Sequence, residues 1–408
     1  MTDIQGTVEA VWRIEGAQVV ATLARVTGDL GLAEDLAQEA VADALTQWPE
    51  SGVPRNAGAW LTAVAKRRAI DTWRRQDRLR ERYRTMAHEL SETTEDEWQP
   101  IEDDVLRLVF TACHPVLSRE AQVCLTLRVV SGLTTEEIAR IMLVPVPTVQ
   151  ARITRAKKTL AASRVPFQAP EPAEWSARLS GVLGVVYAVF TEGYAATSGE
   201  RWIRPDLALE ALRLGRVLAR LLPREPEVHG LVALMEFQAS RFGARTAGDG
   251  SPVLLADQDR SRWDRAQIRR GQAALALADE VGRGRASYAL QAAIAECHAV
   301  ARSVEETDWD RIVLLYEALG RVAPSPVVEL NRAVAVSMAT GPASALRIVD
   351  RLSCAGQLRG SHLLPSVRGE LLAQLGRTEE ARSELVTAAG LARNEREAEV
   401  LRAKAARL

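Results

Sequence analysis

The stretch TTEEIARIMLVPVPTVQARITRAKKTL, residues 134–160, predicts a helix-turn-helix. Thr134 and Glu137 have the spacing of a capping box, which starts a helix at the residue after Thr134. Two prolines, Pro145 and Pro147, end that helix, and Pro147 suits the first turn of the next one. In this second helix the apolar side chains recur at helical spacing and should face inward: Val149, Ile153, Ala156 and Leu160.

The outer face of the second helix is basic, with four cations and no acid, in a chain whose net charge is only −1. In a helix-turn-helix the second helix enters the major groove of DNA, where Arg and Lys contact bases and phosphates. The sequence therefore predicts a local DNA-binding surface. Its candidate residues are Thr148, Gln150, Arg152, Arg155, Lys157 and Lys158. The alternative is a solvated amphipathic helix of the kind found in any helical protein.

The whole chain of 408 residues predicts an all-α protein of several domains, because strand signals are nearly absent and Ala, Leu, Arg and Glu recur at helical spacing. The four cysteines form no C-x-x-C pair, so we expect a reduced, cytoplasmic protein without a metal or other cofactor. The longest apolar stretch, residues 179–190, is too short to cross a bilayer, and we expect no membrane partner.

Charge alternates in sign along the first 165 residues. Residues 29–43 carry five acids and no base on an amphipathic helix, whereas residues 66–84 carry nine cations against three acids. Residues 89–104 carry eight acids and no Lys or Arg. Such a run repels itself and seldom packs, so it predicts a flexible linker between two separate basic modules.

These features divide the chain into six segments. The segments are a first helical domain (8–84), an acidic linker (85–104), the helix-turn-helix domain (105–163), a Pro-rich connector (164–174), a central helical domain (175–284) and C-terminal repeats (285–408). The repeats are predicted because residues 329–352 resemble residues 365–388, each with a turn near a glycine, Gly341 or Gly376. The offset of about 36 residues is similar to that of tetratricopeptide hairpins, which bind peptides or partner proteins.

The order of these motifs resembles region 2 and region 4 of bacterial extracytoplasmic-function sigma factors. Residues 34–48 (EDLAQEAVADALTQW), 60–65 (WLTAVA) and 69–75 (AIDTWRR) resemble region 2, and the helix-turn-helix resembles region 4. Residues 257–265 (DQDRSRWDR) resemble the subgroup with a long C-terminal extension. The resemblance implies a sigma factor that binds core RNA polymerase, recognises and opens a promoter, and catalyses no covalent chemistry.

The resemblance also implies roles for particular residues. The acidic helix would bind the β′ clamp helices of the polymerase through Asp35, Gln38 and Glu39, and the β flap is the other expected polymerase contact. The minus-10 element would be melted and read by Arg55, Asn56, Trp60, Lys66, Arg67, Arg74 and Arg75. The minus-35 element would be read by the outer residues of the helix-turn-helix. Trp60 has an alternative place in the helical core, and Arg67 stands where many relatives carry Asn, which favours phosphate contact there.

The extension is expected to regulate the sigma factor in cis, by positioning the promoter-reading modules or by binding a regulatory protein. Its DQDRSRWDR block is interpreted as a loop pinned by Arg–carboxylate hydrogen bonds and anchored by Trp263. Two other classes of function stay open at this point. One is a one-component regulator that joins the helix-turn-helix to a helical sensor, and the other is an enzyme within the extension, which carries no nucleophile-elbow or phosphate-loop motif.

Overall fold

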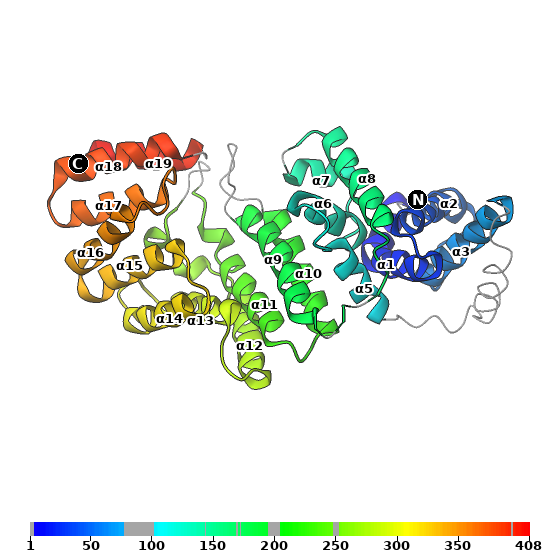
Figure 1. Cartoon of the computed structure of the whole chain (residues 1–408), viewed down its shortest axis with the longest axis horizontal. Coiled ribbons are helices and arrows are strands. Elements are labelled where there is room, and N and C mark those ends of the chain that lie inside the picture. Colours follow the sequence, from blue (N-terminus) through cyan, green and yellow to red (C-terminus); the bar gives the residue numbers. More distant parts are fainter. Residues whose placement is uncertain are drawn as a thin grey trace. The chain divides into compact units, whose positions relative to one another are not determined.

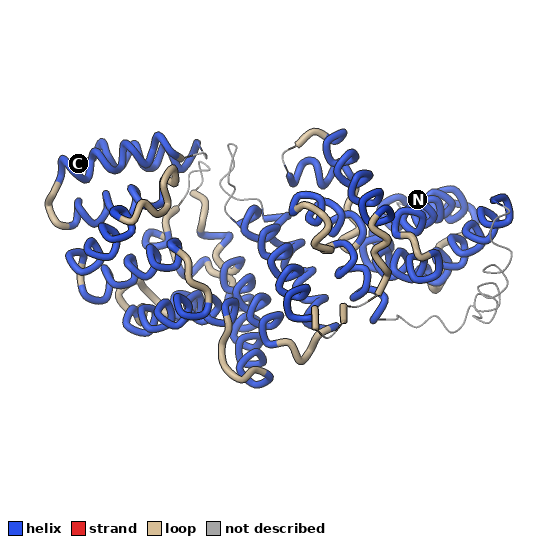
Figure 2. Tube along the Cα trace, viewed as in Figure 1, coloured by secondary structure: helices blue, strands red, loops and turns tan. Residues whose placement is uncertain are grey.

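The computed structural model describes residues 4–76, 102–142, 144–168, 170–171, 173–194, 205–247, 253–392 and 395–408. Within these ranges the protein is all-α, as predicted: helices are joined by loops and three short 3-10 helices, and no strand is formed (Figures 1 and 2). None of the described helices combines the length and the apolar composition that a membrane span requires. The chain divides into two compact units, Met1–Val186 and Tyr187–Leu408, called the N-terminal and the C-terminal unit below.

The N-terminal unit begins with a three-helix bundle. Its helices are α1 (Ile4–Thr27), α2 (Leu30–Ser51) and α3 (Ala57–Gln76). Asp29 starts α2 because its carboxylate accepts hydrogen bonds from the backbone N–H groups of Gly31 and Leu32. Six consecutive residues of α1, Val19–Ala24, are all buried, which happens only when a helix is covered on every side. α1 is therefore the central helix of this unit.

The other side of α1 is covered by the second group of helices. These helices are α5 (Glu102–Ala112), α6 (Arg119–Val129), α7 (Thr135–Met142) and α8 (Val146–Ala162). α1 packs on α5 and α6, and α2 packs on α8. The two groups of helices therefore pack against each other within the N-terminal unit.

The acidic linker predicted for residues 85–104 lies mostly outside the described residues, but its last three residues begin α5. Asp104 is completely buried, and its carboxylate accepts hydrogen bonds from Arg25 (2.9 Å) and Arg107 (2.6 Å). The prediction that the linker extends to residue 104 is wrong because two guanidinium groups compensate the buried charge.

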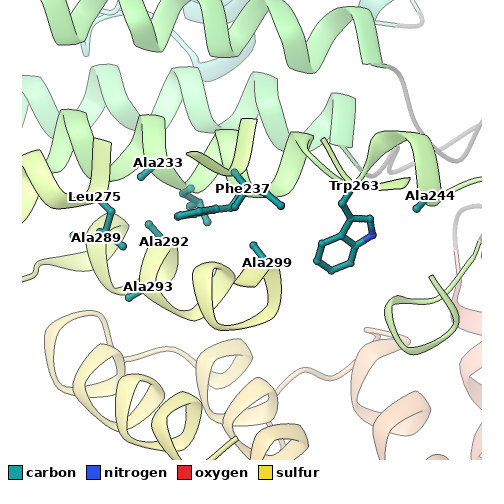
Figure 3. Packing of buried hydrophobic residues seen from close by; sticks show 11 residues of the cluster. Ala233, Phe237, Ala244, Trp263, Leu275, Ala289, Ala292, Ala293 and Ala299 are labelled. Carbon is teal, nitrogen blue, oxygen red and sulfur yellow. The ribbon is translucent and has the colours of Figure 1, made fainter. Parts of the chain in front are cut away.

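The C-terminal unit starts within α9 (Trp175–Tyr194) and is built from closely packed helices. Its first full helices are α10 (Pro205–Leu221), α11 (Pro226–Ala239), α12 (Arg265–Val281) and α13 (Ser287–Val300). Figure 3 shows Phe237 of α11 surrounded by small residues, among them Ala233 and Ala292. At Gly230 the helices α11 and α13 approach so closely that an added Cβ would lie 2.7 Å from the backbone nitrogen of Ala289.

The DQDRSRWDR block forms a loop that Trp263 anchors, because the indole is only 2% exposed. Arg260 holds the loop by donating hydrogen bonds to the backbone carbonyl oxygens of His298 (3.0 Å) and Ala301 (2.9 Å). Asp264 caps α12. Arg260 was predicted to bind a carboxylate, but it binds these backbone carbonyls instead. The last carbonyl groups of a helix such as α13 have no partner within the helix and need hydrogen-bond donors from elsewhere.

The remaining helices form consecutive hairpins. They are α14 (Trp309–Val322), α15 (Pro326–Thr340), α16 (Pro342–Cys354), α17 (Leu363–Gln374), α18 (Thr378–Leu391) and α19 (Glu395–Arg407). α17 begins 37 residues after α15, and α18 begins 36 residues after α16. The turns of these hairpins contain Gly341 and Gly376 at φ values of 99° and 75°, a conformation that favours glycine.

Candidate nucleic-acid interface

The helix-turn-helix forms as the sequence predicts. The backbone N–H of Glu137 donates to Thr134 Oγ1 (3.1 Å), and the backbone N–H of Thr134 donates to Glu137 Oε2 (2.8 Å), which completes the capping box. α8 begins at Val146, so Pro147 lies in its first turn. The predicted inner residues of α8 are all buried: Val149, Ile153, Ala156 and Leu160. The α7–α8 motif is thus positioned by its own caps and apolar stripe.

The outer residues of α8 differ in how far they reach solvent. Gln150, Arg155 and Lys158 are exposed, whereas Thr148, Arg152 and Lys157 are half-buried. The Arg152 guanidinium lies near the thiol of Cys124 on α6 and acts to lower the pKa of that thiol, although burial raises it. The exposed group is therefore free to meet a phosphate or a base edge, and the half-buried group is partly engaged within the protein.

Lys157 is held by the acidic helix α2. Its ammonium group donates hydrogen bonds to the carboxylates of Glu34 and Asp35, the latter at 3.1 Å. Arg128 of α6 donates to Glu34 at 2.7 Å. Burial would raise the pKa of Glu34, but Arg128 and Lys157 hold it below its usual value. Lys157 was predicted to lie on the outer face of α8. The structure contradicts this prediction, because α2 packs against the side of α8 that carries Lys157. The sequence of α8 alone does not reveal that contact.

Glu34 and Arg128 are the residues that sequence reasoning missed. The carboxylate of Glu34 is buried between two cations from different helices, α6 and α8. A signal for it was present, because Glu34 falls at helical spacing from the buried residues Leu30 and Ala37 and so lies on the apolar stripe of α2. An acid in such a position needs a cationic partner from elsewhere in the fold.

The polymerase-facing residues predicted on α2 lie together on one outer surface. Asp35 and Glu39 are exposed and Gln38 is half-buried. Asp35 contacts Lys157, and Glu39 accepts a hydrogen bond from Arg68 of α3 at 2.8 Å. This surface is accessible but carries cationic side chains of its own protein, so part of its charge is neutralised.

The basic residues predicted for the minus-10 element lie just before α3 and along its length. Arg55 and Arg67 are exposed, and Lys66 is half-buried. Burial and the neighbouring Arg25 lower the pKa of Lys66. Two further predictions, Arg74 and Arg75, fall in the last turns of α3, and their side chains lie outside the described residues. The described part of this group therefore offers two solvent-facing cations, Arg55 and Arg67, for phosphate contact.

Two of the predicted minus-10 residues have structural roles. Asn56 caps the start of α3, since its side-chain oxygen accepts a hydrogen bond from the backbone N–H of Ala59 at 3.0 Å. Trp60 is half-buried and packs edge to face against the buried Trp48, with ring centroids 5.4 Å apart. Trp60 therefore fits its alternative place in the helical core, although one side of it still meets solvent.

The described residues contain no group of three or more His, Cys, Asp or Glu side chains suited to hold a metal ion. Three cysteines, Cys113, Cys124 and Cys297, are buried, and Cys354 is exposed. Burial raises the pKa of Cys113 to about 11, which leaves its thiol protonated and unreactive at neutral pH.

Comparisons with known proteins divide the chain in the same order. Residues 12–79 match sigma-70 region 2, and residues 107–160 match sigma-70 region 4. Residues 178–279 match a family of unknown function, DUF6596. The uncharacterized protein R00370 of Rhizobium meliloti (strain 1021) is 44% identical over 395 residues, which cover 94% of this chain and 92% of that protein. No solved structure matches.

Proposed function

This chain belongs to the sigma-70 family of transcription initiation factors, and on that premise we propose which of its surfaces act in initiation. It is a sigma factor, similar to extracytoplasmic-function members, that binds core RNA polymerase and recognises promoters through regions 2 and 4. A long C-terminal extension follows these regions. The family consists of non-enzymatic initiation factors, so we expect the chain to act by binding polymerase and promoter DNA.

We assign minus-35 recognition to the exposed residues of α8. Gln150, Arg155 and Lys158 face solvent in the part of the chain that matches region 4. Arg155 is suited to donate two hydrogen bonds to a guanine, and Lys158 to neutralise a phosphate. The exposure of this basic face on a capped second helix is the observation that carries the proposal.

Region 2 serves two partners in this proposal. Asp35, Gln38 and Glu39 on α2 bind the basic surface of the β′ clamp helices, while Arg55 and Arg67 contact the phosphates of the minus-10 element. Support comes from the exposure of Asp35 and Glu39 on α2, and of Arg67 on α3 and Arg55 just before it. Region 4 makes the second polymerase contact, at the β flap.

We infer that α2 and α8 separate when the protein engages polymerase and promoter. The ion pairs from Lys157 to Glu34 and Asp35 use a predicted DNA-binding cation and a predicted polymerase-binding acid at the same time. Neither side chain is fully available to its external partner while these pairs persist. Separation releases Lys157 to contact phosphate and releases the carboxylate of Asp35 to contact the clamp helices.

Copurification with core RNA polymerase and run-off transcription test this function. We expect the wild-type protein to form a holoenzyme that initiates at a defined promoter. Arg155→Ala should weaken promoter binding by about 1 to 3 kcal/mol without changing polymerase binding. Arg220→Ala, an exposed arginine of α10, is the matched control. Failure of the protein to copurify with polymerase contradicts the proposal.

The extension is proposed to regulate these regions in cis and to bind a regulatory protein through its helical hairpins. The support is that α14 to α19 form consecutive hairpins of the kind that present repeated helix faces to a partner. The test compares the full chain with a chain that ends at Val186, where the N-terminal unit ends. Equal initiation by both chains at every promoter, with and without cell extract, contradicts regulation by the extension.

A further inference from the structure

The C-terminal unit contains a cavity of about 480 Å³ that promoter recognition does not use. Side chains of α11, α13, α14 and α15 line it, and this volume lies within the range of small-molecule sites. Much of the wall is hydrocarbon, including Leu234, Phe237, Ile294 and Leu319. One charged residue, Arg241, lies in this wall. An apolar cavity with one cation is suited to a ligand that has an apolar body and one negative charge.

The positive charge of Arg241 has no carboxylate partner within 4.0 Å among the described residues. Its guanidinium group donates a hydrogen bond to the Tyr194 hydroxyl and lies 5.6 Å from the ring centroid of Tyr194 and 5.7 Å from that of Trp263. Burial, together with Arg245 and Arg260, lowers the pKa of Arg241 to about 9. The group therefore stays protonated at neutral pH, where aromatic contacts attract it without neutralising its charge.

The polar part of the wall is also incomplete. Two buried polar atoms, Gln238 Oε1 and His298 Nδ1, have no hydrogen-bond partner among the described residues. Burial and the nearby arginines lower the pKa of His298 to about 4, so its ring is neutral and cannot act as a second cation. Buried polar atoms without partners are rare in native proteins, and they point to a group that enters this part of the wall.

We propose that this cavity binds a small organic carboxylate, whose anionic group pairs with Arg241 and whose apolar body lies against Leu234, Phe237 and Ile294. A planar carboxylate matches the guanidinium group because it accepts two parallel hydrogen bonds. A single negative charge balances the single cation in the wall. A phosphate dianion would leave one charge uncompensated in an apolar cavity, which is costly.

Isothermal titration calorimetry on the full chain tests the proposal. The probes are benzoate, 4-hydroxybenzoate, phenylacetate, indole-3-acetate and hexanoate, each compared with its neutral amide. We expect at least one acid to bind about tenfold or more tightly than its amide, because only the acid pairs with Arg241. Arg241→Gln should abolish that preference. Arg269→Gln, which changes an exposed arginine of α12, should retain it.

A second variant tests the proposal independently of whether Arg241→Gln folds. Ala295→Leu adds volume to the cavity wall from α13 and leaves the guanidinium group in place. It should weaken the largest acids most, while near-ultraviolet circular dichroism stays that of the wild type. The proposal is wrong if no acid binds more tightly than its amide, or if Ala295→Leu leaves the affinities unchanged in a folded protein. Because polymerase is absent from the titration, these outcomes are independent of the role in transcription.

Discussion

The contact between α2 and α8 gives a quantitative prediction for Glu34→Gln. The change keeps the shape of the side chain but removes the charge that compensates Arg128 and Lys157, and the carboxylate is only 6% exposed. Breaking a buried ion pair by removing one partner costs about 3 to 5 kcal/mol. In Glu34→Gln, Lys157 keeps its hydrogen bond to the carboxylate of Asp35, and Arg128 keeps its hydrogen bond to the backbone carbonyl of Leu133. We therefore expect a loss of about 2 kcal/mol.

Hydrogen exchange resolved by peptide is the suitable assay, because it measures the stability of each helix within a chain of two units. A loss of 2 kcal/mol makes the slowest amides of α2 and α8 exchange roughly 30-fold faster. Amides of the C-terminal unit should not change. A double-mutant cycle with Lys157→Met should give a coupling above about 1 kcal/mol, whereas the exposed Glu379–Arg382 pair should give less than about 0.5 kcal/mol.

The pH dependence of the same contact has a definite sign. The folded-state pKa of Glu34 lies below its ordinary value of 4.5, so its stabilising contribution is complete above that value and is lost as the pH falls through the folded-state pKa. The wild-type protein should lose protection of α2 and α8 in this acidic range more steeply than Glu34→Gln does. A coupling energy near zero between Glu34 and Lys157 would show that these ion pairs do not hold α2 and α8 together. Identical pH profiles for the wild type and Glu34→Gln would show the same.

Three other outcomes can be measured. Gly230→Ala should destabilise the C-terminal unit by about 1 to 3 kcal/mol in denaturant titrations, since the new Cβ meets the backbone of Ala289 at 2.7 Å; an unchanged midpoint contradicts this. Asn56→Ala should cost about 1 kcal/mol of α3 stability by hydrogen exchange, and promoter opening should survive in Asn56→Asp if the residue acts only as a cap. A thiol reagent should modify Cys354 in the native protein and leave Cys113 unmodified until denaturant is added; rapid native labelling of both thiols excludes the packing described.

The ion pairs between α2 of region 2 and α8 of region 4 affect both the stability of these helices and their proposed binding to DNA and polymerase. The ion pairs that hold α8 against α2 also occupy Lys157 and Asp35, which the proposed function assigns to DNA and polymerase. Polymerase and promoter must then supply enough binding energy to replace these pairs. Glu34→Gln should consequently raise the affinity of the free protein for promoter DNA while it lowers the protection of α2 and α8.

The sequence alone determined the local features of this protein. The capping box at Thr134 and Glu137, the start of α8 near Pro147 and the apolar stripe from Val149 to Leu160 depend on residues within a few positions of each other. Such short-range patterns fix a helix and its buried face without reference to the remainder of the chain. The order of region 2, region 4 and extension was equally readable, since each is a contiguous stretch.

Only the tertiary structure decided which charged groups pair across long separations. Glu34 and Lys157 are 123 positions apart, and Asp104 and Arg25 are 79 apart, so no helical period connects them. The cavity beside Arg241 likewise exists only where α11, α13, α14 and α15 meet. A charge pattern gives the sign of a segment, whereas the burial of a charge and the identity of its partner depend on which helices pack together. That packing is set by apolar surfaces distributed over the whole chain.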